Sequence, residues 1–173
     1  GMEPSGEACN HWSLWKSDFD LLSDLGVDSY RFSIEWSRLE PSPGEWNDSA
    51  MRKYSEMVDD LISRGIRPMP TLHHFSHPSW WEETGGFAEK ENLEEFQSFC
   101  ERVFDSLSDR VDVWCTINEP TVFSVMGYTL GQFPPGKRSI FLTLRVMKNM
   151  MRGHANVYRS LKKRKPECKI GLA

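Results

Sequence analysis

The sequence predicts an α/β fold, a partial (β/α)8 (TIM) barrel that contains about strands 2 to 5 with their intervening helices. Segments with helical spacing of apolar residues alternate regularly with short apolar runs. Each run follows its helix through a tight or charged turn, which favours parallel strands joined by helical crossovers. No glycine-rich phosphate loop follows a run, and this disfavours a doubly wound nucleotide-binding sheet.

Four segments have the periodicity of amphipathic helices. They cover residues 11–26, 49–65, 92–107 and about 139–165. Gly26 and Gly65 stand where glycine commonly ends a helix. Asn92, with Glu95 three residues later, resembles a capping box at the start of the third segment.

Four apolar runs predict strands that begin near residues 29, 67, 111 and 169. A complete (β/α)8 barrel needs about 250 residues. We therefore expect residues 1–173 to form a single domain that is part of such a barrel. An open barrel wall exposes strand edges and an apolar face, so self-association of the isolated chain is also expected.

Composition excludes some classes of protein. The net charge is −4, which does not favour nucleic acid, and the basic run from Lys162 to Lys169 is interpreted as a solvated helix end. No apolar stretch approaches the ~20 residues of a membrane span. The four cysteines are widely spaced without a CxxC pair, which favours buried, reduced thiols and a cytoplasmic location.

Polar side chains follow three successive strands. Glu35 comes after the first, "HHFSHP" (73–78) ends the second, and "NEP" (118–120) ends the third. Reactive residues of (β/α)8 barrels lie at the carboxyl ends of the strands, so these groups are expected to meet at one rim.

Asn118 and Glu119 are the strongest candidates at this rim. A carboxyl at a strand end, backed by an apolar barrel, is expected to be partly desolvated, which favours the protonated form of a general acid. The amide of Asn118 can both donate to and accept from hydroxyl groups beside it. The alternative is that the two residues cap a loop or pair with a nearby arginine.

The three histidines of "HHFSH" raise the question of a metal site. His73 and His74 point to opposite faces of an extended strand, and no nearby Cys or Asp completes a recognisable ligand set. We therefore expect no metal: one histidine belongs to the site and one is packed or faces solvent. His154 is interpreted as a core residue with its hydrogen bonds satisfied.

Four segments together resemble glycoside hydrolase family 1, the retaining β-glycosidases that include β-glucosidases. They are "SGEACNHW", "SYRFSIEWSRLEPSPGEWN", "TLHHFSHPSWWEETGGF" and "TINEPTVFSVMGYTLGQFPPG". The resemblance runs from about Ser5 to the last residue, in order and with family-like spacing. It implies hydrolysis of a β-glucoside, or of a 6-phospho-β-glucoside, without a metal or an organic cofactor.

The resemblance also implies roles for individual residues. Glu119 matches the acid/base, and Arg31 matches an arginine beside the nucleophile. Asn118 matches the residue that contacts the sugar 2-hydroxyl, and His74 matches a sugar-binding histidine. Phe75 stands where the family usually has tryptophan.

Two departures from the family bear on function. Glu35 stands where the family usually has Ala or Ser, and a structural ion pair with Arg31 or Arg38 is expected for it. The nucleophile motif T-E-N-G is not found in these residues. A retaining mechanism needs two carboxyl groups about 5 Å apart, so activity of the isolated chain is doubtful. A truncated, non-catalytic carbohydrate-binding or interaction protein remains the alternative.

Overall fold

The computed structural model describes residue 6 and residues 8–173, so Ser5 lies outside the described part. The centre of the fold is a parallel sheet with the strand order β1-β2-β3-β4. The strands are β1 (Ser29–Ser33), β2 (Arg67–His73), β3 (Val113–Ile117) and β4 (Lys169–Gly171). Their number, order and parallel direction agree with the prediction, and β3 begins slightly later than expected.

The four predicted helices are also present. They are α1 (His11–Leu25), α3 (Asp48–Ser63), α5 (Leu93–Leu107) and α7 (Ile140–Arg164). Short helical segments occupy the connections: α2 (Trp36–Leu39), α4 (Ser79–Glu83), η1 (Gly86–Ala88), α6 (Pro120–Ser124) and η2 (Val125–Thr129). None of the helices in the described part combines the length and the apolar composition that crossing a membrane requires.

The helix ends test two local predictions. Gly26 adopts φ 69°, and its N–H donates to carbonyls of the last turn of α1, so the predicted glycine stop is confirmed. The capping box at Asn92 is wrong. The side chain of Asn92 turns back and donates to the carbonyls of Thr84 and of the buried Gly86, so it is not available to cap the helix.

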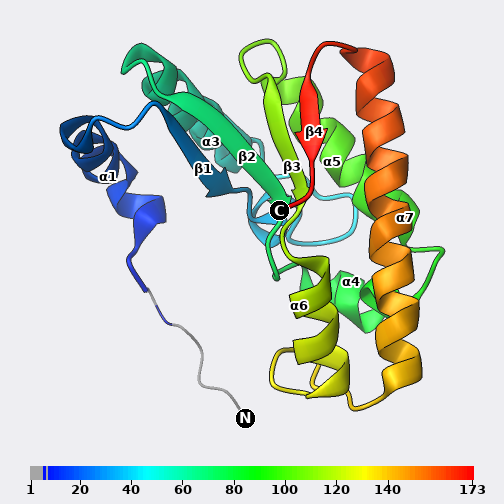
Figure 1. Cartoon of the computed structure of the whole chain (residues 1–173). Helices are drawn as coiled ribbons and strands as arrows, with labels where there is room; N and C mark the ends of the chain where they lie inside the picture. Colours follow the sequence, from blue (N-terminus) through cyan, green and yellow to red (C-terminus); the bar gives the residue numbers. More distant parts are fainter. Residues whose placement is uncertain (1–5, 7) are drawn as a thin grey trace.

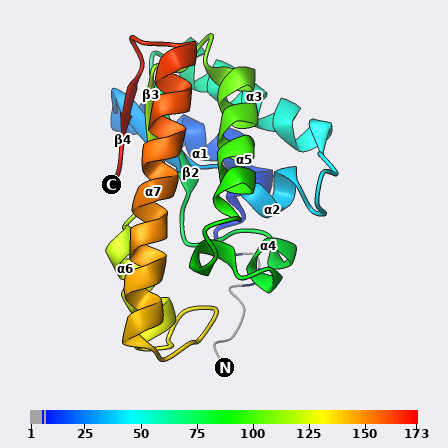
Figure 2. The same cartoon turned by 90° about the vertical axis from the view of Figure 1, so that its right-hand side faces the viewer.

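Helices α3, α5 and α7 cover one face of the sheet (Figures 1 and 2). The predicted apolar stripe of α5 is buried along its whole length: Leu93, Phe96, Phe99, Cys100, Val103, Phe104 and Leu107. No described helix crosses the opposite face in Figure 1. Doubly wound sheets carry helices on both faces, whereas a barrel wall carries them on one, so the chain has the architecture of a partial (β/α)8 barrel.

Aromatic side chains support the end of the sheet where the strands finish. Trp36, Trp81, Phe87, Phe96 and Phe99 are all almost completely buried there. The rings of Trp36 and Phe99 stack with their centroids 4.7 Å apart. The loops that follow the strands therefore rest on a closely packed apolar base.

Candidate active site

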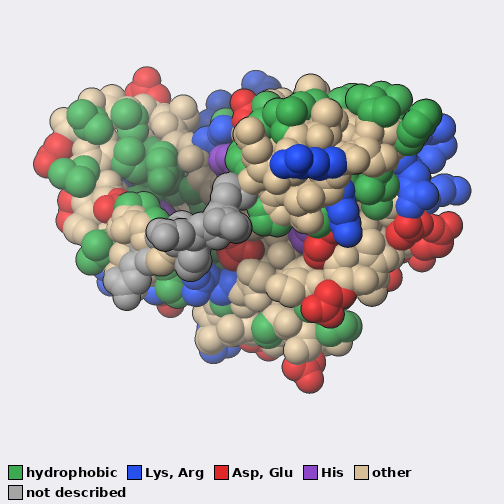
Figure 3. All heavy atoms as spheres, turned by 90° about the horizontal axis from the view of Figure 1, so that it is seen from below, with side chains coloured by type: hydrophobic (Ala, Val, Ile, Leu, Met, Phe, Trp, Pro, Cys, Tyr) green, Lys and Arg blue, Asp and Glu red, His purple; other side chains and the backbone are tan. Residues whose placement is uncertain are grey.

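The ends of three strands bring the five predicted site residues together. Arg31 lies in β1, His74 and Phe75 directly follow β2, and Asn118 and Glu119 directly follow β3. The N–H of Asn118 donates to the carbonyl of His73 (2.8 Å), which extends the parallel pairing to the last residue of each strand. Figure 3 looks at this end of the molecule, where histidine and acidic side chains appear in the hollow between the two halves of the surface.

Asn118 is the buried centre of this group, with 3% of its surface exposed. Arg31 Nη1 donates to Asn118 Oδ1 (2.9 Å), and this bond fixes which end of the amide is the acceptor. Asn118 Nδ2 is therefore directed toward Glu119 Oε2, 3.4 Å away. The arrangement leaves the amide N–H groups on the side of the carboxylate.

Glu119 adopts a left-handed conformation (φ 41°, ψ 63°) between β3 and α6. The N–H of Glu119 donates to the carbonyl of Ala173 (2.8 Å), and Pro120 occupies the first turn of α6. A residue with a side chain is strained in this conformation by about 1–2 kcal/mol. The expected desolvation of Glu119 is wrong: its side chain is exposed, because no described segment covers this side of the sheet.

His74 lies beside both charged residues. Its Nδ1 is 2.7 Å from Ser33 Oγ. Partial burial lowers the pKa of His74, the nearby Arg31 cation lowers it further, and Glu119 acts in the opposite direction. The ring is therefore neutral at neutral pH and can donate or accept a hydrogen bond.

His73 points away from the site, into the aromatic base, with 1% of its surface exposed. The prediction that His73 and His74 lie on opposite faces is therefore confirmed. Among the described residues, no group of three or more His, Cys, Asp or Glu side chains is placed to hold a metal ion. His154 Nδ1 is 2.7 Å from Thr116 Oγ1, in agreement with a satisfied histidine, but the residue is only half-buried, so the expected core position is wrong.

Phe75 forms an aromatic wall next to His74. Its ring centroid lies 5.2 Å from that of His74 and 5.7 Å from that of Phe133. Its backbone has φ 69°, so a second residue of the site is in the left-handed region. Such conformations in residues with side chains are typical of functional sites.

The ion pair expected for Glu35 is wrong. Glu35 Oε1 accepts from Ser37 Oγ (2.7 Å) and the Ser37 N–H, and Oε2 accepts from Ser76 Oγ (2.7 Å). The two arginines are engaged elsewhere: Arg31 binds Asn118, and Arg38 stacks on the ring of Trp12.

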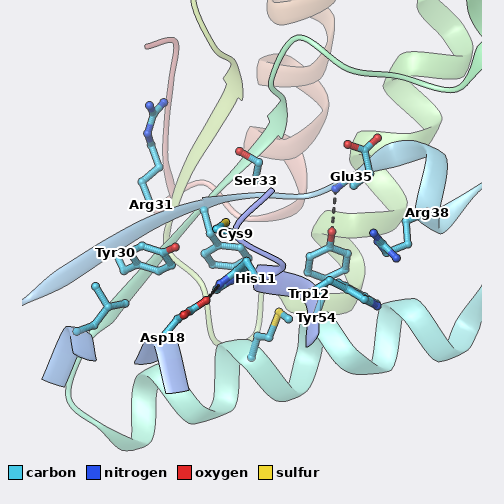
Figure 4. Close-up of a pocket in the computed structure, with 13 residues that line it drawn as sticks. Cys9, His11, Trp12, Asp18, Tyr30, Arg31, Ser33, Glu35, Arg38 and Tyr54 are labelled. Atoms are coloured by element: carbon cyan, nitrogen blue, oxygen red, sulfur yellow. Dashed lines mark hydrogen bonds and ion pairs between the residues drawn. The ribbon is translucent and has the colours of Figure 1, made fainter. Parts of the chain in front are cut away.

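A pocket of about 570 Å³ runs along β1 (Figure 4). Arg31, Ser33 and Glu35 project from the same side of β1 in that view, away from Tyr30. A second pocket, of about 350 Å³, borders the loop after β2 and includes Phe75, Ser76 and His77. Only the second pocket is lined by the segment that carries Phe75, whereas the first borders Arg31, Ser33 and Glu35 from the side of α1 and α3.

Sequence analysis missed Ser33, Ser76 and Glu82 as contributors to this region. Ser33 contacts His74, Ser76 contacts Glu35, and Glu82 contacts His77. The alternation of Arg31 and Ser33 in β1 with Glu35 just after it was a usable signal, since alternate residues of an extended segment share one face. The other two depend on how a loop folds back, which residue spacing does not show.

A one-sided (β/α) wall that presents a carboxylate, an amide, a histidine and an arginine at its strand ends is typical of a (β/α)8 barrel enzyme. The family model of Glycosyl hydrolase family 1 matches residues 2–173, and the chain belongs to this family. The resemblance recognised in the sequence is thereby confirmed.

Individual relatives support this assignment. β-Glucosidase A of Thermotoga maritima is 34% identical over 166 residues, which are 95% of this chain and 37% of the relative. The cytosolic β-glucosidase of Homo sapiens is 41% identical over 131 residues, 75% of this chain and 28% of the relative. The solved β-glycosidase from Pyrococcus horikoshii superposes with a TM-score of 0.90 at 42% identity, over 95% of this chain and 38% of that one. The chain thus spans well under half the length of the relatives that it matches.

Proposed function

We propose that this chain provides the acid/base side of the active site of a retaining β-glucosidase. The observation that carries the proposal is the Asn118–Glu119 pair at the end of β3, oriented by Arg31 and placed beside the neutral ring of His74. Glu119 protonates the glycosidic oxygen in the first step and activates water in the second.

The neighbouring side chains bind the sugar. Asn118 presents its amide N–H groups beside Glu119, where they can hold the 2-hydroxyl and stabilise the oxocarbenium-like transition state. His74 offers an imidazole nitrogen to a further sugar hydroxyl, and the aromatic ring of Phe75 next to it covers the apolar side of the sugar ring.

The second carboxyl group of the reaction comes from a segment outside these four strands. Glu35 is poorly suited to attack an anomeric carbon, because both of its carboxylate oxygens accept hydrogen bonds from Ser37 and Ser76. By resemblance to the family, the nucleophile follows the seventh strand of the complete barrel, and Arg31 lies where it would keep that carboxylate ionised.

The substrate class follows from the relatives. Several of them are named β-glucosidases, which supports a plain β-glucoside rather than a 6-phospho-β-glucoside. A pair of carboxyl groups suffices for the mechanism, so no metal or organic cofactor is required. We also propose a cytosolic location, since all four cysteines are free and three of them are buried.

The test is release of nitrophenol from an aryl β-glucoside. The 173-residue chain alone is expected to give no turnover, because it matches only one of the two carboxyl groups. A chimera that joins this chain to the remaining part of the Thermotoga maritima enzyme, in place of the aligned segment, is expected to be active. E119Q in the chimera should remove most of this activity.

Azide and E35Q complete the design. Azide should restore turnover to the E119Q chimera, because it attacks the glycosyl-enzyme intermediate without needing a general base. E35Q in the chimera should still release nitrophenol, because Glu35 is not the catalytic nucleophile. An active chimera whose turnover is unaffected by E119Q would contradict the proposed role of Glu119. A folded chimera that binds sugar but shows no turnover would favour the non-catalytic alternative.

A further inference from the structure

The segment that follows β2 (residues 74–78, here called the β2 loop) is attached to the end of β1 by two side-chain bonds. Ser33 Oγ lies 2.7 Å from His74 Nδ1, and Ser76 Oγ donates to Glu35 Oε2 at 2.7 Å. Ser33 and Glu35 are two residues apart, as are His74 and Ser76, so the two bonds attach the same face of the β2 loop to the segment at the end of β1. Phe75 lies between them.

On its other side the β2 loop is held by a chain of three polar side chains, of which His73 is buried and His77 and Glu82 are partly buried. His77 Nε2 lies 2.8 Å from Glu82 Oε2, and His77 Nδ1 lies 3.2 Å from His73 Nε2. A carboxylate only accepts, so with neutral rings His77 carries its proton on Nε2 and accepts at Nδ1 from the Nε2–H of His73. This order leaves Nδ1 of His73 as an unprotonated acceptor, and that buried atom indeed has no partner among the described residues.

Aromatic rings enclose this polar chain. Phe87 and Phe123 lie edge-on to both imidazoles, and Trp81 lies edge-on to His77. Gly86 leaves room for the carboxylate, because a Cβ there would stand 2.6 Å from Glu82 Oε2. The two imidazoles are shielded from water by these rings, whereas Glu82 keeps 27% of its side chain exposed, so the bond between His73 and His77 is the one that solvent would not replace.

The contacts on both sides of the β2 loop restrain the backbone of Phe75. Its φ of 69° places it in the left-handed region, which costs a residue with a side chain about 1–2 kcal/mol. Such a conformation persists when the surrounding contacts over-determine it. The bonds at Ser76 and His77 are the contacts that directly follow Phe75 in the chain.

We propose that Glu35 and His77 are positioning residues that hold Phe75 in its left-handed conformation and thereby orient His74 and Phe75 toward the sugar. The inference rests on the proposed function for the identity of the ligand. Glu35 uses one oxygen to cap α2 through Ser37 and the other to hold the loop through Ser76. Glu35, which stands where the family usually has Ala or Ser, therefore holds the β2 loop in place without touching the reacting atoms.

The experiment compares isotope-labelled variants of the 173-residue chain by NMR, and every variant also carries Leu172→Lys beside the β4 edge to limit self-association. Ser76→Ala removes only the bond from Glu35 to the loop and leaves the cap of α2 intact, and Ser76 is exposed, so the variant should fold. H77L removes both bonds of His77, whereas H77Q retains one donor and one acceptor. E83Q is the matched control, because it removes the exposed carboxylate next to Glu82 in α4.

Three readouts are measured on each variant. Backbone couplings report the sign of φ at Phe75, and imidazole ¹⁵N shifts report the tautomers of His73 and His77. The third readout is a titration with glucoimidazole, which is bound to one of the solved relatives. In S76A and H77L, Phe75 is expected to leave the left-handed region and glucoimidazole binding to weaken about five- to tenfold. H77Q and E83Q should resemble the parent chain.

The outcomes separate the two proposals. A positive φ at Phe75 in S76A would overturn the positioning role of Glu35, and a positive φ at Phe75 in H77L would overturn that of His77. Failure of the parent chain to bind glucoimidazole would count against sugar binding by this chain, while the conformation of Phe75 would still decide whether Glu35 and His77 position the loop.

Discussion

At the scale of single residues, Glu119 combines strain with function. Its left-handed backbone turns the chain from β3 into α6 and directs the carboxylate toward Asn118. A glycine would satisfy this geometry without a steric penalty, so the presence of a glutamate indicates that the side chain is needed there.

This strain gives a prediction about stability. Glu119→Gly should have a free energy of unfolding about 1 kcal/mol higher than Glu119→Ala, because alanine keeps the Cβ that is crowded at φ 41° and glycine does not. Urea unfolding of the two variants measures the difference. Equal stabilities would show that Glu119 is not strained in solution.

His73 gives a prediction about pH. Burial, with His77 and His74 beside it, lowers the pKa of His73 well below its usual value. Below about pH 6.5 the unfolded chain takes up a proton on this ring and the folded chain does not, so the free energy of unfolding falls as the pH falls. The slope attributable to one such histidine is at most about 1.4 kcal/mol per pH unit.

The comparison of parent and His73→Phe by urea unfolding at pH 7.5 and pH 5.5 tests this. Phenylalanine suits the aromatic surroundings and cannot titrate, so H73F should lose less stability on acidification than the parent. His74 and His154, whose pKa values are also lowered by burial, remain in both proteins and give the residual slope. Identical slopes in the two proteins would contradict the prediction.

At the scale of elements, the packing of α7 on α5 depends on a small residue. A Cβ on Gly153 would stand 3.3 Å from the ring of Phe96 and 3.5 Å from Leu93. Glycine is otherwise unfavourable in the interior of a helix by about 1 kcal/mol. Close approach of the two helices is therefore the physical reason for Gly153 in the middle of α7.

Gly153→Val should lower the free energy of unfolding by about 2 kcal/mol, since the added methyl groups must displace the buried ring of Phe96. Arg159→Val, on the exposed side of α7, introduces the same β-branched residue without the clash. Thermal unfolding of the pair separates packing from helix propensity, and equal losses in both would refute the packing argument.

At the scale of the whole molecule, the chain is an open wall. The edges of the sheet at β1 and β4 are not paired with described strands. The outer side of α7 also exposes large apolar side chains: Ile140, Phe141, Leu144, Met151 and Tyr158. Unpaired edges and contiguous apolar surface favour association with another polypeptide or a second copy.

We therefore expect the isolated 173-residue chain to self-associate at micromolar concentration, as measured by light scattering. Leu172→Lys places a charge beside the β4 edge and should reduce the apparent mass. Ile62→Lys, an equally exposed position on α3, should not. A monodisperse monomer of the parent chain would contradict the expectation.

Much of the fold was predictable because it depends on local order in the sequence. Helical stripes such as that of α5, and glycine stops such as Gly26, follow from periodicity and backbone freedom. The polar residues at the strand ends were predictable for the same reason: parallel strands place their carboxyl ends at one edge. The positions of Arg31, His74, Asn118 and Glu119 thus follow from the pattern once the strands are known.

The tertiary structure alone decided which partner each polar group takes. Asn92 looked like a cap and Glu35 looked like half of an ion pair, but Asn92 binds buried carbonyls and Glu35 binds two serines. Pairing depends on which groups are deprived of water when loops pack together, and this is a property of three-dimensional proximity. The sequence by itself determined the barrel wall, the family and the residues at its rim; the structure determined their contacts, because these join positions distant in the chain.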